Sequence, residues 1–254
     1  MNQQAFLWGR RTADNPEAVE KLLLNQNKKP KAKLPEGLDE IIEHRATILV
    51  SYQNQACADR YRSVVARVQA AEQNLSPTST AFTKTVAESF FKLMAYKDEY
   101  EVARLHSSDA FHEQLKSQFS GDYKLKFNLA PPLFAKKNPS TGEPKKSEYG
   151  AWVMPLFKTL AKMKGLRGTA FDLFGYTKER KTERQLIENY DKGLDLLISK
   201  LTVENLPTAV EIAQLPQTIR GYGHIKDASI EQAKIVRTAL LERFEQGVTK
   251  KAAE

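Results

Sequence analysis

The amino-acid sequence predicts a mainly α-helical protein with one small β-hairpin element. Apolar residues recur at steps of three and four along most of the 254 residues, a spacing that aligns them on one face of a helix. Only residues 123–129 alternate apolar and polar side chains with the period of a strand. Hydrophobic residues make up 41% of the chain, so it can bury the core of a globular protein.

Residues 1–35 are expected to form a part of their own, ahead of a helical domain over residues 36–254. Asn15 and Pro16 have the features of a helix start, because asparagine caps a first turn and proline fits the first helical position. The run 25–33 is polar, basic and interrupted by proline, which is typical of a linker.

Two apolar stripes predict two helices at the start of the larger part. The first stripe comprises Leu38, Ile41, Ile42, Arg45, Leu49 and Tyr52, and the second comprises Tyr61, Val64, Val65 and Val68. A third helix is predicted over residues 90–105, because its large apolar side chains recur at the same spacing. Its acidic pair, Asp98 and Glu99, is expected on the solvated face. Short connections between these helices favour antiparallel neighbours.

The middle of the chain predicts the hairpin. Ser107–Asp109 has the residue types of a cap and starts a further helix. The alternating segment 123–129 is expected to form one strand, and the proline- and glycine-rich run 138–144 is expected to form a turn. The chain would then return as a second strand through residues 145–149.

The last third is again predicted to be helical. A helix is expected over residues 151–164, followed by an irregular, aromatic loop at 165–175. The apolar seam from Ile187 to Leu201 predicts a long packed helix. Arg220–His224 is read as a glycine-bounded turn, and Ser229–Gln232 as a capping box that opens the final helix.

The chain is basic, with 39 Lys and Arg residues against 31 Asp and Glu. The excess gathers between Lys136 and Arg184 and in a cluster of lysines at 28–33. Nucleic-acid modules usually combine such charge with stacking aromatic residues or a recognition helix, and neither is evident, so nucleic acid is not the expected partner. No apolar run is long enough for a membrane span, and no secretory leader pattern is present, so a cytoplasmic location is expected.

Motifs of catalysis are missing from the sequence. The single cysteine, Cys57, excludes an intrachain disulfide and an iron–sulfur cluster held by this chain's own thiolates. The segment Gly221–Lys226 begins like a dinucleotide-binding motif, but Lys226 stands where the third glycine belongs. The four histidines lack the spacing of metal ligands. The sequence therefore offers no candidate catalytic, cofactor-binding or metal-ligating residue.

Four segments carry a family resemblance, in the same order as in that family: residues 91–105 (FKLMAYKDEYEVARL), 121–132 (GDYKLKFNLAPP), 166–180 (LRGTAFDLFGYTKER) and 219–226 (IRGYGHIK). They resemble the C-terminal region of the fused, single-chain indolepyruvate (2-oxoacid):ferredoxin oxidoreductases. The opening segment 2–10 is similar to the end of the γ-type domain of these enzymes, so residues 1–35 would be the end of that domain.

The resemblance implies a role in a larger enzyme. The parent enzymes decarboxylate aryl 2-oxoacids on thiamine diphosphate, form an acyl-CoA, and pass electrons through iron–sulfur clusters to ferredoxin. None of their catalytic residues matches a position in this chain. We therefore expect a non-catalytic accessory domain that carries no cofactor itself and that binds the catalytic domains of the parent oxidoreductase.

Two loops contain the candidate interaction residues. Arg167 and Phe171 lie in the first loop, and Arg220, Tyr222 and His224 lie in the second. Arginine and aromatic residues are enriched in the cores of protein interfaces, so these five are expected to pack on the catalytic part of the parent enzyme. The alternative is that both loops only cap their own helices.

Two further interpretations remain open at the level of sequence. The basic span from Lys136 to Arg184 could steer an acidic ferredoxin toward the enzyme. Alternatively, the chain is a free-standing basic helical module that binds RNA or another polyanion, which would show as a steep loss of binding with salt.

Overall fold

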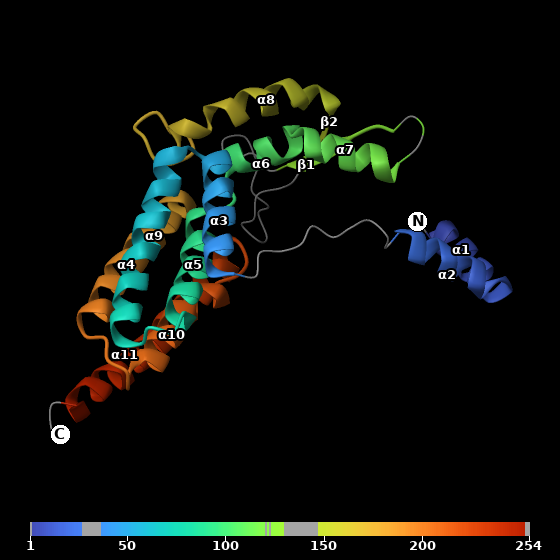
Figure 1. Ribbon diagram of the computed structural model, residues 1–254. Coiled ribbons are helices and arrows are strands. Elements are labelled where there is room, and N and C mark those ends of the chain that lie inside the picture. The colour runs from blue at the N-terminus through green and yellow to red at the C-terminus, as the bar shows by residue number, and fades with distance from the viewer. Residues whose placement is uncertain (1, 27–36, 120, 122, 130–146, 252–254) are drawn as a thin grey trace. The chain divides into compact units, whose positions relative to one another are not determined.

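The computed structural model describes residues 2–26, 37–119, 121, 123–129 and 147–251 (Figure 1). The chain divides into two compact units, residues 1–37 and 38–254. The described part is mainly helical and contains one two-stranded antiparallel sheet, as predicted. No helix in these ranges is both long and apolar enough to cross a membrane.

The first unit contains two helices, α1 (Asn2–Asp14) and α2 (Pro16–Gln26). The predicted helix start is confirmed, because the side chain of Asn15 accepts a hydrogen bond from the amide of Ala18 at 2.9 Å. Most of the predicted basic linker lies outside the described residues.

Six helices contribute to the main core of the second unit: α3 (Leu38–Tyr52), α4 (Gln55–Leu75), α5 (Ala81–Met94), α9 (Lys178–Ser199), α10 (Leu206–Gln214) and α11 (Gly223–Lys251). The predicted stripes supply it, since Leu49, Tyr61 and Leu194 are almost fully buried. The Phe90 ring stacks between those of Tyr61 and Tyr190, with centroids 6.3 and 6.0 Å away. Aromatic stacking therefore joins α4, α5 and α9.

The predicted helix over residues 90–105 is wrong in one respect, because the chain leaves the helix after Met94 and starts α6 (Glu99–Ser107). Asp98 causes the new start, since its carboxylate accepts a hydrogen bond from the amide of Glu101 at 2.8 Å. Asp98 is also buried, which corrects the expectation that it lies on a solvated face.

The predicted hairpin is confirmed. Helix α7 (Asp109–Gln118) begins at Ser108, whose hydroxyl accepts a hydrogen bond from Phe111. Strands β1 (Lys126–Leu129) and β2 (Ser147–Gly150) pair antiparallel, with Phe127 opposite Tyr149. The turn predicted at 138–144 lies outside the described residues. Phe127 belongs to a smaller core that also contains Ala103, Val153 and Phe157.

The helix expected over 151–164 is present as α8 (Met154–Lys162), flanked by the 3-10 turns η1 (Ala151–Val153) and η2 (Met163–Leu166). In Figure 1 helix α8 lies along α6, and the two helices make extensive contact. Residues 167–177 form an irregular loop without regular helix or strand, as predicted.

The final helix, α11 (Gly223–Lys251), begins six residues before the predicted capping box. Ser229 lies inside this helix, where its hydroxyl accepts from the amide of Arg220 and donates to the carbonyl oxygen of Thr218. Gly221 and Gly223 adopt φ angles of 90° and 54°, which glycine tolerates best. The chain can thus turn sharply after η3 (Leu215–Thr218) and enter the helix early.

Candidate functional site

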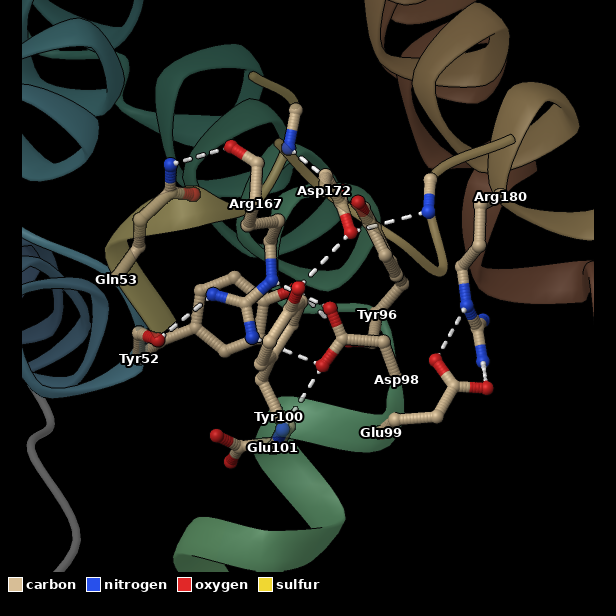
Figure 2. A network of polar contacts seen from close by, with 12 residues as sticks. Tyr52, Gln53, Tyr96, Asp98, Glu99, Tyr100, Glu101, Arg167, Asp172 and Arg180 are labelled. Carbon is tan, nitrogen blue, oxygen red and sulfur yellow. Dashed lines mark hydrogen bonds and ion pairs between the residues drawn. The ribbon is translucent and has the colours of Figure 1, made fainter. Parts of the chain in front are cut away.

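A buried ion pair between Asp98 and Arg167 joins two of the segments that carry the family resemblance (Figure 2). The guanidinium Nε lies 2.5 Å from Oδ2, and Nη2 lies 2.9 Å from Oδ1, so the contact is bidentate. Both side chains are only 3% exposed. Such planar, paired hydrogen bonds are the strong form of the arginine–carboxylate interaction.

The remaining contacts of Arg167 reach the end of α3. Its Nη1 donates to the carbonyl oxygen of Tyr52 at 2.7 Å, and its guanidinium lies 3.7 Å from the centre of the Tyr52 ring. The hydroxyl of Tyr52 donates in turn to the carbonyl oxygen of Tyr96 at 2.9 Å. Burial raises the pKa of Tyr52, and that of Tyr96 to about 12, so both phenols keep their protons at neutral pH. Arg167 therefore clamps the loop to α3 and to the start of α6.

The buried carboxylate of Asp172 binds backbone amides at both ends of the first loop. Its carboxylate accepts hydrogen bonds from the amides of Gly168 and Gly175, at 2.8 and 3.0 Å, and from the hydroxyl of Tyr100 at 3.2 Å. A Cβ atom at Gly175 would lie 2.5 Å from this carboxylate, so only glycine fits there. Asp172 therefore ties the two ends of the loop together, in addition to the buried ion pair of Arg167.

Ion pairs continue from this network toward the surface. Arg180 contacts both oxygens of Glu99, at 3.1 and 3.3 Å, and Arg104 contacts both oxygens of Glu101 at 2.8 Å. The charged residues of the segment 91–105 thus pair largely within the fold.

The second loop is tied to the same helices. The ammonium group of Lys92 donates to the carbonyl oxygens of Pro216, Gln217 and Ile219, at 2.8 to 3.0 Å. Burial lowers the pKa of Lys92, and the neighbouring cations add to this effect. Lys226 pairs with Glu183 of α9 at 2.6 Å. Residues 216–226 are therefore anchored on both sides.

The five predicted interaction residues occupy different environments. Arg167 is enclosed, so its side chain contacts the chain's own groups. Phe171 and Tyr222 are 76% and 74% exposed, and Arg220 and His224 are exposed as well. Contact with a partner stays a prediction for these four. The structure places Arg167 and Phe171 on one loop, Arg220 and Tyr222 on the second loop, and His224 in the first turn of α11.

Sequence reasoning missed Asp98 and Asp172, which hold the first loop. Asp98 is followed three residues later by Glu101, which is the spacing of a capping box and could have revealed the break. No comparable signal identifies Asp172.

Exposed apolar side chains lie on both loops and in the first turn of α11, and we call them the exposed loop residues: Phe171, Leu173, Tyr176, Tyr222 and Ile225. Contacts within the chain support the backbone of these residues. The hydroxyl of Tyr176 donates to the carbonyl oxygen of Ala170, and Lys178 pairs with Asp227 at 3.1 Å, joining the bases of the two loops. Large apolar side chains that are exposed to solvent in this way are typical of a protein interaction site.

Acid–base or nucleophilic chemistry finds little support in the described part of the chain. The acids and bases of the network are paired with each other. Cys57 lies half-buried in the first turn of α4, and burial raises the pKa of its thiol, so it is protonated at neutral pH. Within these ranges, no group of three His, Cys, Asp or Glu residues could hold a metal ion.

Many basic side chains are already engaged. Arginines of α4, α6, α9 and α11 pair with carboxylates, namely Arg60, Arg62, Arg67, Arg104, Arg180 and Arg243. Within the basic span from Lys136 to Arg184, residues 136–146 lie outside the described ranges, and Lys164 binds the carbonyl oxygens of Val50 and Ser51. These side chains are therefore committed to contacts within the fold, while the net positive charge of the chain is unchanged by the pairing.

Comparison with known protein families gives one match. The model described as "Family of unknown function (DUF6537)" matches residues 38–239, which contain the buried network and both loops. Neither the curated proteins nor the solved structures contain a match to this chain.

Proposed function

The chain belongs to the DUF6537 family, and from that premise we propose that it is a non-catalytic accessory domain of an indolepyruvate (2-oxoacid):ferredoxin oxidoreductase. In this role it binds the catalytic domains of the parent enzyme and supports their assembly. The observation that carries the proposal is the set of exposed loop residues held in place by a buried polar network.

The segments of the family resemblance support this role through their contacts. Residues 91–105 supply Lys92, which fastens the second loop, and Asp98, which fastens the first. One helix–turn segment therefore positions both loops. Burying charged groups costs free energy, but here it orders the two loops. Such order suits an assembly domain, because a loop that is ordered before binding loses less entropy on association.

The cofactors of the parent enzyme belong to its catalytic domains in this proposal. Within the described residues the cysteine ligands of an iron–sulfur cluster are not available, because Cys57 is the only thiol of the chain. No step of the reaction is therefore assigned to this chain. The parent enzyme, its ferredoxin and this domain would work together in the cytoplasm.

A mixing experiment tests the proposal. The chain is added to an indolepyruvate:ferredoxin oxidoreductase shortened to end before the region that it resembles. We expect the two to co-elute in gel filtration, and ferredoxin reduction by indolepyruvate to increase. The proposal fails if the chain neither binds nor changes activity. It also fails if the chain instead binds RNA with an affinity that falls steeply with salt, which would favour a polyanion-binding module.

A further inference from the structure

A pocket of about 380 Å³ lies between α5, α9, α10 and α11, within the second unit. Its walls are largely apolar, and they are formed by Leu93, Leu186, Tyr190, Leu194, Leu197, Ile212, Leu215, Pro216, Ile219, Ile230 and Ala233. Tyr190 holds the wall in shape, because its hydroxyl donates to the carbonyl oxygen of Ala213 at 2.8 Å. The volume falls in the range of pockets that bind small molecules.

The charged side chains that line this pocket are all basic. Lys192, Lys234 and Arg237 contribute to its lining, and none of the lining side chains is acidic. Lys234 pairs with Glu231 at 2.7 Å. Arg237 is half-buried and forms no hydrogen bond or ion pair with any residue that the structure describes. Its guanidinium is therefore available to form charge-assisted hydrogen bonds with an anion at the pocket.

Gly193 of α9 makes room for this guanidinium. It is the single glycine within α9, where glycine is less favourable for the helix than alanine. A Cβ atom at this position would lie 3.0 Å from Nη2 of Arg237, closer than nearly all real Cβ contacts. The glycine therefore lets Arg237 approach the α9 backbone at the pocket.

We propose that this pocket binds a small amphipathic monocarboxylate, with its apolar body between α9, α10 and α11 and its carboxylate on Arg237. Both parts of the ligand follow from the site. The apolar walls select the body through burial of apolar surface, and the single-signed lining selects an anion. The inference does not depend on the accessory role, because the pocket is lined by core helices and not by the exposed loop residues.

Calorimetric titration of the full chain tests the inference with three probes: decanoate, 1-naphthoate and the neutral decanol. We expect at least one carboxylate to bind more tightly than decanol. Binding of decanoate alone identifies a straight-chain acid, and binding of naphthoate alone identifies an aryl acid. Binding of neither carboxylate, or binding of decanol as tightly as the tighter-binding carboxylate, overturns the proposal.

Three variants assign the binding to this pocket. Arg237→Gln should weaken carboxylate binding by about tenfold or more, because a charge-assisted hydrogen bond is lost. Gly193→Leu should weaken it as well, because the added side chain would begin 3.0 Å from Nη2 of Arg237 and displace the guanidinium, while leucine favours the helix. Arg243→Gln on the same helix is the matched control, since Arg243 pairs with Glu211 and does not line the pocket. Undiminished binding by Arg237→Gln, in a variant whose circular dichroism is unchanged, contradicts the assignment.

Discussion

The two loops begin with the same dipeptide, Arg-Gly, and each carries an exposed aromatic residue, Phe171 or Tyr222, yet the two arginines serve different purposes. Arg167 is buried in a bidentate pair with Asp98, whereas Arg220 is exposed and is held through its backbone amide. The difference comes from a partner on another segment, because the buried carboxylate of Asp98 pairs with Arg167. Arg167 therefore holds the first loop from inside the fold, whereas the side chain of Arg220 lies on the surface.

The largest expected loss of stability follows from replacing the buried arginine, Arg167. Arg167→Met should lower the free energy of unfolding by about 3–5 kcal/mol, because Asp98 is left buried without a counter-charge. Urea denaturation measures the change. Arg62→Met is the matched control, since Arg62 forms an exposed pair with Glu43 that should be worth about 1 kcal/mol or less. Equal losses in the two variants would contradict the structural role of Arg167.

Lys92→Met tests whether the second loop is held independently of the first. The variant should lose about 1.5–3 kcal/mol of unfolding free energy, because three carbonyl oxygens lose a charged donor. Hydrogen exchange should also accelerate in residues 216–226 while the first loop keeps its protection. Uniform acceleration in both loops would show that Lys92 does not act on the second loop alone. Lys84→Met, on the same helix, is the control.

His106 provides a buried polar group that, unlike Arg167, has no partner. Its Nδ1 atom is buried without a hydrogen bond among Phe111, Phe127 and Phe157. Burial lowers the pKa of His106 from the ordinary value of 6.5, with a smaller effect of Lys97. The unfolded chain therefore binds the proton first as the pH falls, and the stabilising contribution of the neutral imidazole, complete above pH 6.5, is lost below it.

We thus expect the stability of the wild-type chain to fall more between pH 7.5 and pH 5 than that of His106→Leu. Urea denaturation at the two pH values measures this difference. His44→Leu is the control, because His44 is exposed on α3. The same pH dependence in wild type and His106→Leu would show that His106 does not contribute.

The smallest effect is expected at the exposed arginine. Arg220→Met should change the free energy of unfolding by less than about 0.5 kcal/mol, because the side chain is exposed and the turn is held by the backbone. Thermal melts of this variant and of Arg167→Met make the comparison direct. A loss at Arg220 as large as that at Arg167 would remove the distinction between the two loops.

Much of the architecture could be read from the sequence, because spacing along the chain is a local property. The stripes of α3 and α4 and the alternation at 123–129 predicted helices and a hairpin that the structure contains. The break before α6 was hidden, since the apolar spacing continues across it from Phe90 to Tyr100. The early start of α11 is not evident from the sequence, because glycines such as Gly221 and Gly223 are typical of a turn as well as of a helix boundary.

The site was harder to predict for a physical reason. Asp98 and Arg167 lie 69 residues apart, and no local pattern states which arginine will find a buried acid. Exposure is likewise a property of the fold, so Leu173 and Tyr176 could not be told from core residues by type. The sequence could name the two loops as candidates, whereas three-dimensional packing decides which of their side chains are buried and which are exposed.

The most direct test of the account is the affinity of the chain for the shortened oxidoreductase when Phe171→Ser and Tyr222→Ser are combined. Both side chains are exposed, so the free energy of unfolding should change by less than about 1 kcal/mol. Affinity should fall by about tenfold or more in a calorimetric titration, because aromatic anchors provide much of the energy of an interface. An unchanged affinity in this stable double variant would contradict the claim that the two loops form the contact surface.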